Sequence, residues 1–114
     1  MKFEELQTKV IEWAEKIDIF NKATPLKQLD KTMEEYLETR DAVVAFKNLW
    51  YDEYDPDEEE ILKDIKDGIG DQIVTLIILS KMFNFTVEEC LGFAYDEIKN
   101  RKGEMVDGIF VKES

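Results

Sequence analysis

The sequence predicts an all-α protein: a single-domain four-helix bundle with a small β-hairpin at its C-terminal end. Three observations support this prediction. Apolar residues recur at three- and four-residue spacing over most of the chain, helix-start signals precede several of these stretches, and only two prolines and five glycines interrupt 114 residues. A chain of this length suits one domain. We expect residues 1–103 to form the helical part and residues 104–114 the hairpin.

The first helix is expected over residues 3–18, where large apolar side chains recur at helical spacing. A break follows over residues 19–23. Thr24 then suits a helix N-cap and Pro25 the first helical position, because no backbone N–H is needed there. The second helix should run to about residue 47. One stripe along it carries Leu26, Leu29, Met33, Leu37 and Val44.

The third helix is expected from about residue 58 to 82, with Asp57 and Glu60 at the spacing of a capping box. Its first half is amphipathic. From Ile73 to Leu79 it is apolar on all sides, so this half needs cover from a bundle centre or an oligomer interface.

The last helix should begin at a second capping box, formed by Thr86 and Glu89, and run to about Arg101. Phe85 and Cys90 stand at the positions of a hydrophobic staple. Further on, Asp107-Gly108 separates two short apolar runs. This dipeptide is typical of a tight type I′ turn, so it predicts the hairpin.

Composition removes several classes of function. The net charge is −12, which disfavours duplex nucleic acid as a partner. The chain has no histidine, which excludes Ser-His-Asp triads and histidine zinc sites, and it has no Gly-rich phosphate loop. No apolar stretch is long enough to span a bilayer, and we expect no signal peptide and no membrane partner. The single cysteine fits a reducing compartment, so we expect a cytoplasmic protein.

Carboxylates on the second and third helices are the main candidates for chemistry. Asp64, Asp67 and Asp71 share one face of the third helix, and an acidic face of the second lies away from its apolar stripe. Such faces are most often simply solvated. If the two faces met, each like-charge pair about 4 Å apart would cost around 4 kcal/mol at an effective dielectric near 20. A shared Mg²⁺ or Mn²⁺ would relieve that repulsion, because hard cations prefer oxygen ligands. The acidic face of the second helix comprises Glu34, Glu35, Glu38 and Asp41.

These residues also resemble a known family. The pattern Gln28-x-x-Lys31-x-x-Glu34-Glu35-x-x-Glu38, followed by Asp67-Gly-Ile-Gly-Asp71, is similar to the MazG-like branch of the all-α NTP pyrophosphohydrolases. The C-terminal part resembles short phage and bacterial MazG-like proteins through Lys99-Asn100-Arg101-Lys102-Gly103 and Val106-Asp-Gly-Ile-Phe-Val-Lys112. The likeness covers nearly the whole chain from Trp13.

The resemblance implies a bundle of the MazG-like type and an enzyme that splits nucleoside triphosphates into monophosphate and pyrophosphate with Mg²⁺. It also implies a homo-oligomer, a dimer or a tetramer. Glu35 and Glu38 match the first acidic pair of the family, and Asp71 matches the final aspartate. The glutamate expected three residues before Asp71 is replaced by Gly68. Asp67 is the nearest substitute as a metal ligand, with Asp64 and Glu34 as further candidates.

Other residues have assigned roles in this hypothesis. Glu35 or Glu38 would orient or deprotonate the attacking water. The phosphate-binding candidates are Lys31, Lys99, Arg101 and Lys102, and Trp13 and Tyr95 are candidates for stacking on the base. For each of these candidate phosphate-binding and base-stacking residues, the alternative is an ordinary role on the surface or in the core. At the level of function, two alternatives stay open: a catalytically weakened nucleotide-binding or protein-interaction module, because glycine carries no ligand, and an acidic oligomeric helical module with no ligand.

Overall fold

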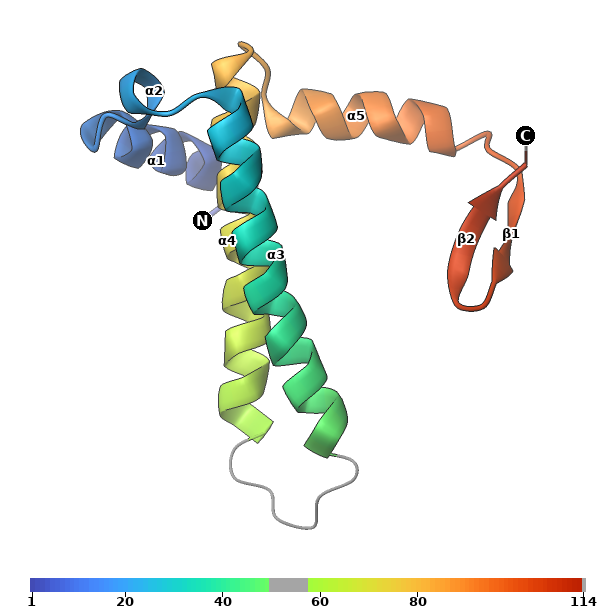
Figure 1. Ribbon diagram of the computed structural model, residues 1–114. Coiled ribbons are helices and arrows are strands. Elements are labelled where there is room, and N and C mark those ends of the chain that lie inside the picture. Colours follow the sequence, from blue (N-terminus) through green and yellow to red (C-terminus); the bar gives the residue numbers. More distant parts are fainter. Residues whose placement is uncertain (50–57, 114) are drawn as a thin grey trace.

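The computed structural model describes residues 1–49 and 58–113, and this part of the chain is mostly helical (Figure 1). The hairpin strands pair antiparallel, with Val106 opposite Ile109. In chain order the elements are α1 (Phe3–Lys16), α2 (Ile19–Lys22), α3 (Pro25–Asn48), α4 (Glu58–Met82), α5 (Val87–Ile98), β1 (Gly103–Val106) and β2 (Ile109–Lys112).

Local signals in the sequence located most element boundaries correctly. The Thr24 hydroxyl accepts a hydrogen bond from the Lys27 N–H (3.2 Å), and Pro25 begins α3. The Thr86 hydroxyl accepts one from the Glu89 N–H (3.1 Å) at the start of α5. At the hairpin, Asp107 and Gly108 both have positive φ, at 51° and 81°, as a type I′ turn requires.

The expected break over residues 19–23 is wrong in part, because it contains the single-turn helix α2. Asp18, in the left-handed region with φ 63°, stops α1 and redirects the chain. Its carboxylate accepts a hydrogen bond from the Asn21 side chain (2.7 Å), which supports the new turn. A four-residue helix is too short to produce a readable periodicity. The capping box expected at Asp57 and Glu60 involves a position outside the described residues.

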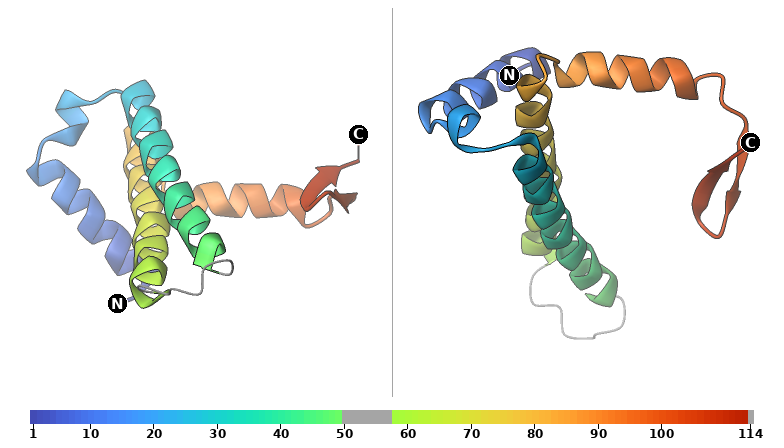
Figure 2. Two further views of the ribbon diagram at one scale, coloured as in Figure 1. Left: turned by 60° about the horizontal axis from the view of Figure 1, so that its bottom comes forward. Right: turned by 45° about the horizontal axis from the view of Figure 1, so that its top comes forward.

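Helices α3 and α4 run side by side, and the surface between them is polar (Figures 1 and 2). The Gln28 side chain donates to the Thr75 carbonyl (3.1 Å), and the Thr32 hydroxyl donates to the Thr75 hydroxyl (2.8 Å). Further along, the Gln72 side chain donates to the Thr39 hydroxyl (3.0 Å). Each buried polar group in this network therefore has a partner on the facing helix, which offsets the cost of its burial.

The apolar stripe of α3 does not contact α4. Because the polar face of α3 is turned toward α4, Leu26, Met33 and Leu37 are all exposed. Among the residues that the structure describes, the buried apolar ones are Ala14 of α1 with Ile77 and Ile78 of α4. Cover for the apolar half of α4 is therefore incomplete, since Ile73 and Leu76 stay exposed.

Around this pair, α1 packs against α4, while α5 projects away and carries the hairpin at its far end (Figures 1 and 2). The described part of the chain thus consists of a close pair of long helices with α1 packed against it, and an arm formed by α5 and the hairpin. A four-helix bundle stays a prediction, and it would need helices from more than one copy of the chain. None of the described helices has the length and apolar character needed to cross a membrane.

Gly68 of α4 faces Thr39 of α3 across the helix pair. A Cβ atom at this position would stand 3.1 Å from Thr39 Cβ and 3.3 Å from Thr39 Cα, and closer still to the Thr39 hydroxyl. That hydroxyl is already engaged, because it donates to the Glu35 carbonyl (2.7 Å) and accepts from Gln72. The glycine is therefore needed for helix packing.

We expect Gly68→Ala to lower the free energy of unfolding by about 1–3 kcal/mol, because the added methyl group would force α3 and α4 apart. Gly70→Ala is the matched control two residues away, where an added Cβ meets nothing within 4 Å. There the loss of glycine flexibility should stabilise the helix by up to about 1 kcal/mol. Urea unfolding measures both. Equal effects of the two substitutions would contradict this account of Gly68.

Candidate functional site

The packing of α3 on α4 brings the two acidic faces of the sequence together. Carboxylates from both helices line one open pocket of about 380 Å³. Its small residues are Ala42, Ala45 and Gly68, which leave room beneath the acids. The acidic lining consists of Glu38 and Asp41 from α3 and Asp64, Asp67 and Asp71 from α4.

Glu35 precedes Glu38 by about one turn of α3, does not itself line this pocket, and is 8% exposed. Its Oε1 atom is 3.4 Å from the Lys31 ammonium, which also pairs with Glu34 at 3.3 Å. Its Oε2 atom is buried and has no hydrogen-bond partner among the described residues. A buried carboxylate oxygen without a partner is costly, so this atom marks a place where a cation or a proton donor would be stabilising.

Mutual repulsion and burial change the acidity of the cluster. The pKa of Asp71 is raised, first by burial and then by the nearby Asp67 and Glu35 carboxylates, with the Lys31 charge acting in the opposite direction. The pKa of Glu38 is also raised, chiefly by the Glu35 carboxylate. Charges on α3 thus act on a carboxylate of α4, which places Glu35, Asp67 and Asp71 within one electrostatic cluster.

These shifts predict how stability depends on pH. A raised pKa means that the folded protein holds a proton that the unfolded chain releases. The ionised cluster therefore destabilises the fold above the raised pKa, and this effect disappears as the pH falls below the ordinary value of 3.8 for an aspartate. We expect Asp71→Asn to raise the melting temperature of the metal-free protein near pH 7. The difference from the unsubstituted protein should shrink toward about pH 4.

Calorimetry in the presence of a chelator measures this difference at each pH. Asp30→Asn is the matched control, since Asp30 is an exposed acid of α3 and does not line the pocket. A difference for Asp71→Asn that stays constant with pH would contradict the proposed cluster.

The donor set fits a hard divalent cation, because it contains only oxygen ligands and a buried oxygen that lacks a partner. In the described residues, no three acidic side chains already converge at the geometry of a bound ion. Side-chain rotation would therefore have to accompany binding. The exposed carboxylates Glu38, Asp64 and Asp67 can rotate at low cost, and the oxygen-only donor set suits Mg²⁺ or Mn²⁺ by its chemistry.

A second hollow adjoins the acidic pocket. It measures about 560 Å³, lies between α1 and α4, and shares Asp67 and Asp71 with the acidic pocket. Its walls are mainly apolar, with Phe3, Leu6 and Val10 from α1 and Ile73, Val74 and Ile77 from α4, and Lys63 and Lys66 at its border. An apolar surface beside two carboxylates and two ammonium groups offers contacts for both an aromatic base and a charged group.

The remaining predicted site residues lie elsewhere. Lys99, Arg101 and Lys102 lie toward the far end of the arm, where Lys99 pairs with Asp96 (3.1 Å) and Arg101 with Glu97 (3.8 Å). Trp13 and Tyr95 are exposed and line neither of the two hollows described above. The structure thus brings together Lys31, Glu34, Glu35, Glu38, Asp64, Asp67 and Asp71, and leaves the other five candidates outside this group.

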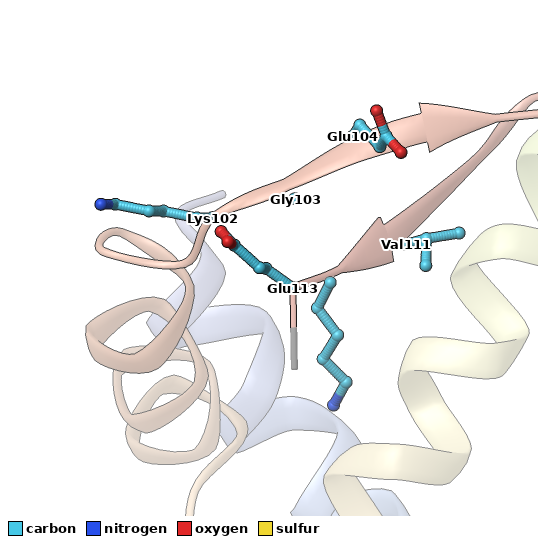
Figure 3. A pocket seen from close by; sticks show the side chains of 6 residues that line it. Lys102, Gly103, Glu104, Val111 and Glu113 are labelled. Atoms are coloured by element: carbon cyan, nitrogen blue, oxygen red, sulfur yellow. The ribbon is translucent and has the colours of Figure 1, made fainter.

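A third hollow, of about 380 Å³, lies beside the hairpin (Figure 3). It is lined by Lys102, Gly103, Glu104, Val111, Lys112 and Glu113, all of which are exposed. Figure 3 shows the Lys102 side chain extending away from the strands. Exposed charges of both signs around a two-stranded ribbon do not form a binding site of their own.

Sequence reasoning missed the groove between α1 and α4. The groove is lined by Lys63 and Lys66 of α4 and by Phe3, Leu6 and Val10 of α1, none of which the sequence marks as part of a site. The available signal was the spacing of the two lysines, which places them on the side of α4 that continues into Gly70 and Ile73. Which helix would lie across that side was not encoded in any local pattern.

Comparison with known proteins assigns the chain neither to a family nor to a fold of known structure. No protein family, no curated protein and no solved structure shows a significant match to this chain.

Proposed function

We propose that the protein is a Mg²⁺-dependent nucleoside triphosphate pyrophosphohydrolase that acts on (d)NTPs as a homo-oligomer of the MazG-like type, a dimer or a tetramer. The single observation that carries the proposal is the meeting of acidic side chains from α3 and α4 in one pocket, with a buried oxygen on Glu35, one turn away along α3, that has no partner among the described residues. Such an arrangement is destabilising for a protein without a cationic ligand, and a metal–phosphate complex supplies one. The resemblance of the sequence motifs supports the same reaction.

In this proposal Glu35, Glu38, Asp67 and Asp71 hold Mg²⁺, with Asp64 as a further ligand. An ion held there would supply positive charge to offset the phosphates and would make a nearby water more acidic. Glu38 has a raised pKa, which suits a carboxylate that accepts a proton from water. The water oxygen bonds to the α-phosphorus, the bond from that phosphorus to the bridging oxygen breaks, and pyrophosphate leaves with the electron pair.

The chain's own cations would orient the substrate. Lys31 is already at the cluster, through its contacts with Glu34 and Glu35. Lys63 and Lys66 border the groove between α1 and α4, so we assign them to the phosphates and the groove to the base. Lys99, Arg101 and Lys102 would reach a phosphate only from a second copy of the chain or after the arm had moved.

The test is an assay of pyrophosphate release from each of the eight common (d)NTPs, with and without Mg²⁺. The proposal expects release from at least one of them that requires Mg²⁺ and is lost in Glu38→Ala. Release that equals the buffer blank for all eight would overturn it.

One observation favours a second candidate, a nucleotide-binding module that has lost turnover. The position where the family carries a second glutamate is Gly68, and Thr39 fills the space around it. A nucleotide that raises the melting temperature without forming product would indicate this function. Gly68→Glu alone is a poor test of restored turnover because it clashes with Thr39, so Thr39→Ala should accompany it.

A further inference from the structure

Lys31 is a positive charge that the structure places against the acidic cluster. Its ammonium lies 3.3 Å from Glu34 Oε1 and 3.4 Å from Glu35 Oε1. These residues stand at the three- and four-residue spacings that bring side chains together on one side of a helix. One lysine is thus shared between an exposed carboxylate, Glu34, and a buried one, Glu35.

The charge of Lys31 acts on carboxylates of both long helices. The pKa of Glu38 is raised chiefly by the Glu35 carboxylate, and the pKa of Asp71 is raised chiefly by burial. The Lys31 charge opposes both of these shifts. The pKa of Lys31 itself is raised, chiefly by its contact with Glu34, so the ammonium is charged at neutral pH. Lys31 therefore offsets negative charge that a divalent cation would otherwise offset.

The two contacts of Lys31 are loose. Strong charge-assisted hydrogen bonds from an ammonium to a carboxylate are about 2.7–2.9 Å long, and both distances here are longer. The Lys31 side chain is 49% exposed, so water can hydrate the ammonium as soon as it leaves a partner. On a helix, a lysine that precedes its glutamate also makes the weaker of the two possible orders. The contact with Glu35 is therefore one that a stronger partner can replace.

The Glu35 carboxylate is only partly satisfied by this lysine. Its Oε1 atom faces the ammonium, whereas Oε2 is buried and has no hydrogen-bond partner among the described residues. A divalent cation carries twice the charge of the ammonium and coordinates carboxylate oxygens directly, so it is the stronger partner. Two cations of different strength would thus compete for the same carboxylate.

We propose that Lys31 is an internal counter-ion, which pairs with Glu35 in the ion-free protein and leaves it when a divalent cation binds there. Glu34 does not line the carboxylate pocket, and it would keep the released ammonium beside the cluster, within reach of a phosphate oxygen. Glu34 then anchors Lys31 and is not a ligand. The inference rests on the metal site of the proposed function, but it does not require turnover of a nucleotide.

The test is the affinity of the nucleotide-free protein for Mn²⁺, measured at fixed ionic strength from the electron paramagnetic resonance of the unbound ion. We expect Lys31→Met to tighten Mn²⁺ binding by about tenfold, because it removes a charge that repels the ion and competes for Glu35. Lys27→Met is the matched control. Lys27 is an exposed lysine one turn earlier on α3, and it lines neither the carboxylate pocket nor the apolar groove. Its substitution should tighten binding by less than about threefold.

Other roles of Lys31 give other results. If the lysine only stabilised the helix, Lys31→Met would bind Mn²⁺ no more tightly than Lys27→Met. If it oriented Glu35 for the ion, Lys31→Met would bind Mn²⁺ more weakly than the unsubstituted protein. Either result would overturn the proposal.

Thermal unfolding of the ion-free protein gives a second readout. Lys31→Met should melt lower than Lys27→Met by roughly 3 °C or more, because a buried carboxylate has lost its only cationic contact in the described part of the chain. In a Glu35→Met background the two substitutions should have equal effects, since no carboxylate is left to pair with Lys31. Equal melting temperatures in the unsubstituted background would contradict the counter-ion.

This inference and the proposed function can fail separately. Mn²⁺ binding that Lys31→Met leaves unchanged contradicts the inference alone. A protein that binds Mn²⁺ but releases no pyrophosphate contradicts the turnover alone, and the tighter binding in Lys31→Met is still expected. An unsubstituted protein that binds no Mn²⁺ contradicts both.

If Lys31→Met does not fold, crystals of the unsubstituted protein with Mn²⁺ decide the question. The Lys31 ammonium should then lie beyond ion-pair distance, about 4 Å, from Glu35 and remain within it from Glu34. A Lys31–Glu35 contact that persists beside a bound ion would overturn the proposal.

Discussion

Asp71→Asn is expected to lower kcat/KM for pyrophosphate release by at least about 100-fold without loss of helical structure. Asp71 lines both the carboxylate pocket and the apolar groove. Its pKa is raised by burial and by the negative charges of Asp67 and Glu35. The amide keeps the shape of the side chain but cannot supply a negatively charged ligand. Catalysis should fall, whereas folding should be unharmed or improved by the loss of repulsion.

Asp30→Asn again serves as the matched control, because it removes one negative charge from α3 outside the pocket. It should retain nearly full activity. Steady-state kinetics at saturating Mg²⁺, with circular dichroism as a check on folding, separates the two variants. Retained turnover in Asp71→Asn, or an equal loss in Asp30→Asn, would contradict the assignment of Asp71 to the metal.

Glu35→Met is expected to have two large and opposite effects. It should abolish the stabilisation that the proposed Mg²⁺ site would give to the protein, because Glu35 is the most buried of the proposed ligands. It should also raise the melting temperature of the metal-free protein by roughly 4 °C or more, because a buried oxygen without a hydrogen-bond partner is replaced by an apolar group of similar length. Most substitutions of buried residues are destabilising, so a gain in stability is diagnostic.

Thermal unfolding with a chelator and with millimolar Mg²⁺ measures both effects. Glu12→Met is the control, since Glu12 pairs with Lys9 from an exposed position of α1 and lines neither hollow. It should leave the Mg²⁺ response in place. A Glu35→Met protein that melts lower than the unsubstituted one without metal would show that the carboxylate is structural.

Short-range signals in the sequence were sufficient to predict where most of the helices begin and where the hairpin turns. Thr24 before Pro25, the Thr86–Glu89 capping box and Asp107-Gly108 each act within a few residues, so each could be read without knowledge of the tertiary structure. The short helix α2 escaped prediction because it depends on the left-handed conformation of Asp18 and on one side-chain hydrogen bond.

Long-range features were harder to read from the sequence. Periodicity identified which residues of α3 share a face, but it could not show that the polar face would pack on α4 and leave Met33 and Leu37 exposed. The pairing of Gly68 with Thr39 joins residues on two helices, and no local pattern encodes it. The hypothesis of a shared divalent cation required the acidic faces of the two helices to lie together. Acidic side chains of α3 and α4 do line one pocket. The roles of these carboxylates stay predictions.

The central claim is that carboxylates of α3 and α4 bind one divalent cation together. Crystals grown with Mn²⁺ test it most directly, because anomalous scattering locates the ion independently of any assay. We expect a peak between the two helices, with oxygen atoms of Glu35 or Glu38 and of Asp67 or Asp71 at about 2.0–2.3 Å from it. Ordered Mn²⁺ found only elsewhere, or bound by acids of a single helix, would contradict the claim.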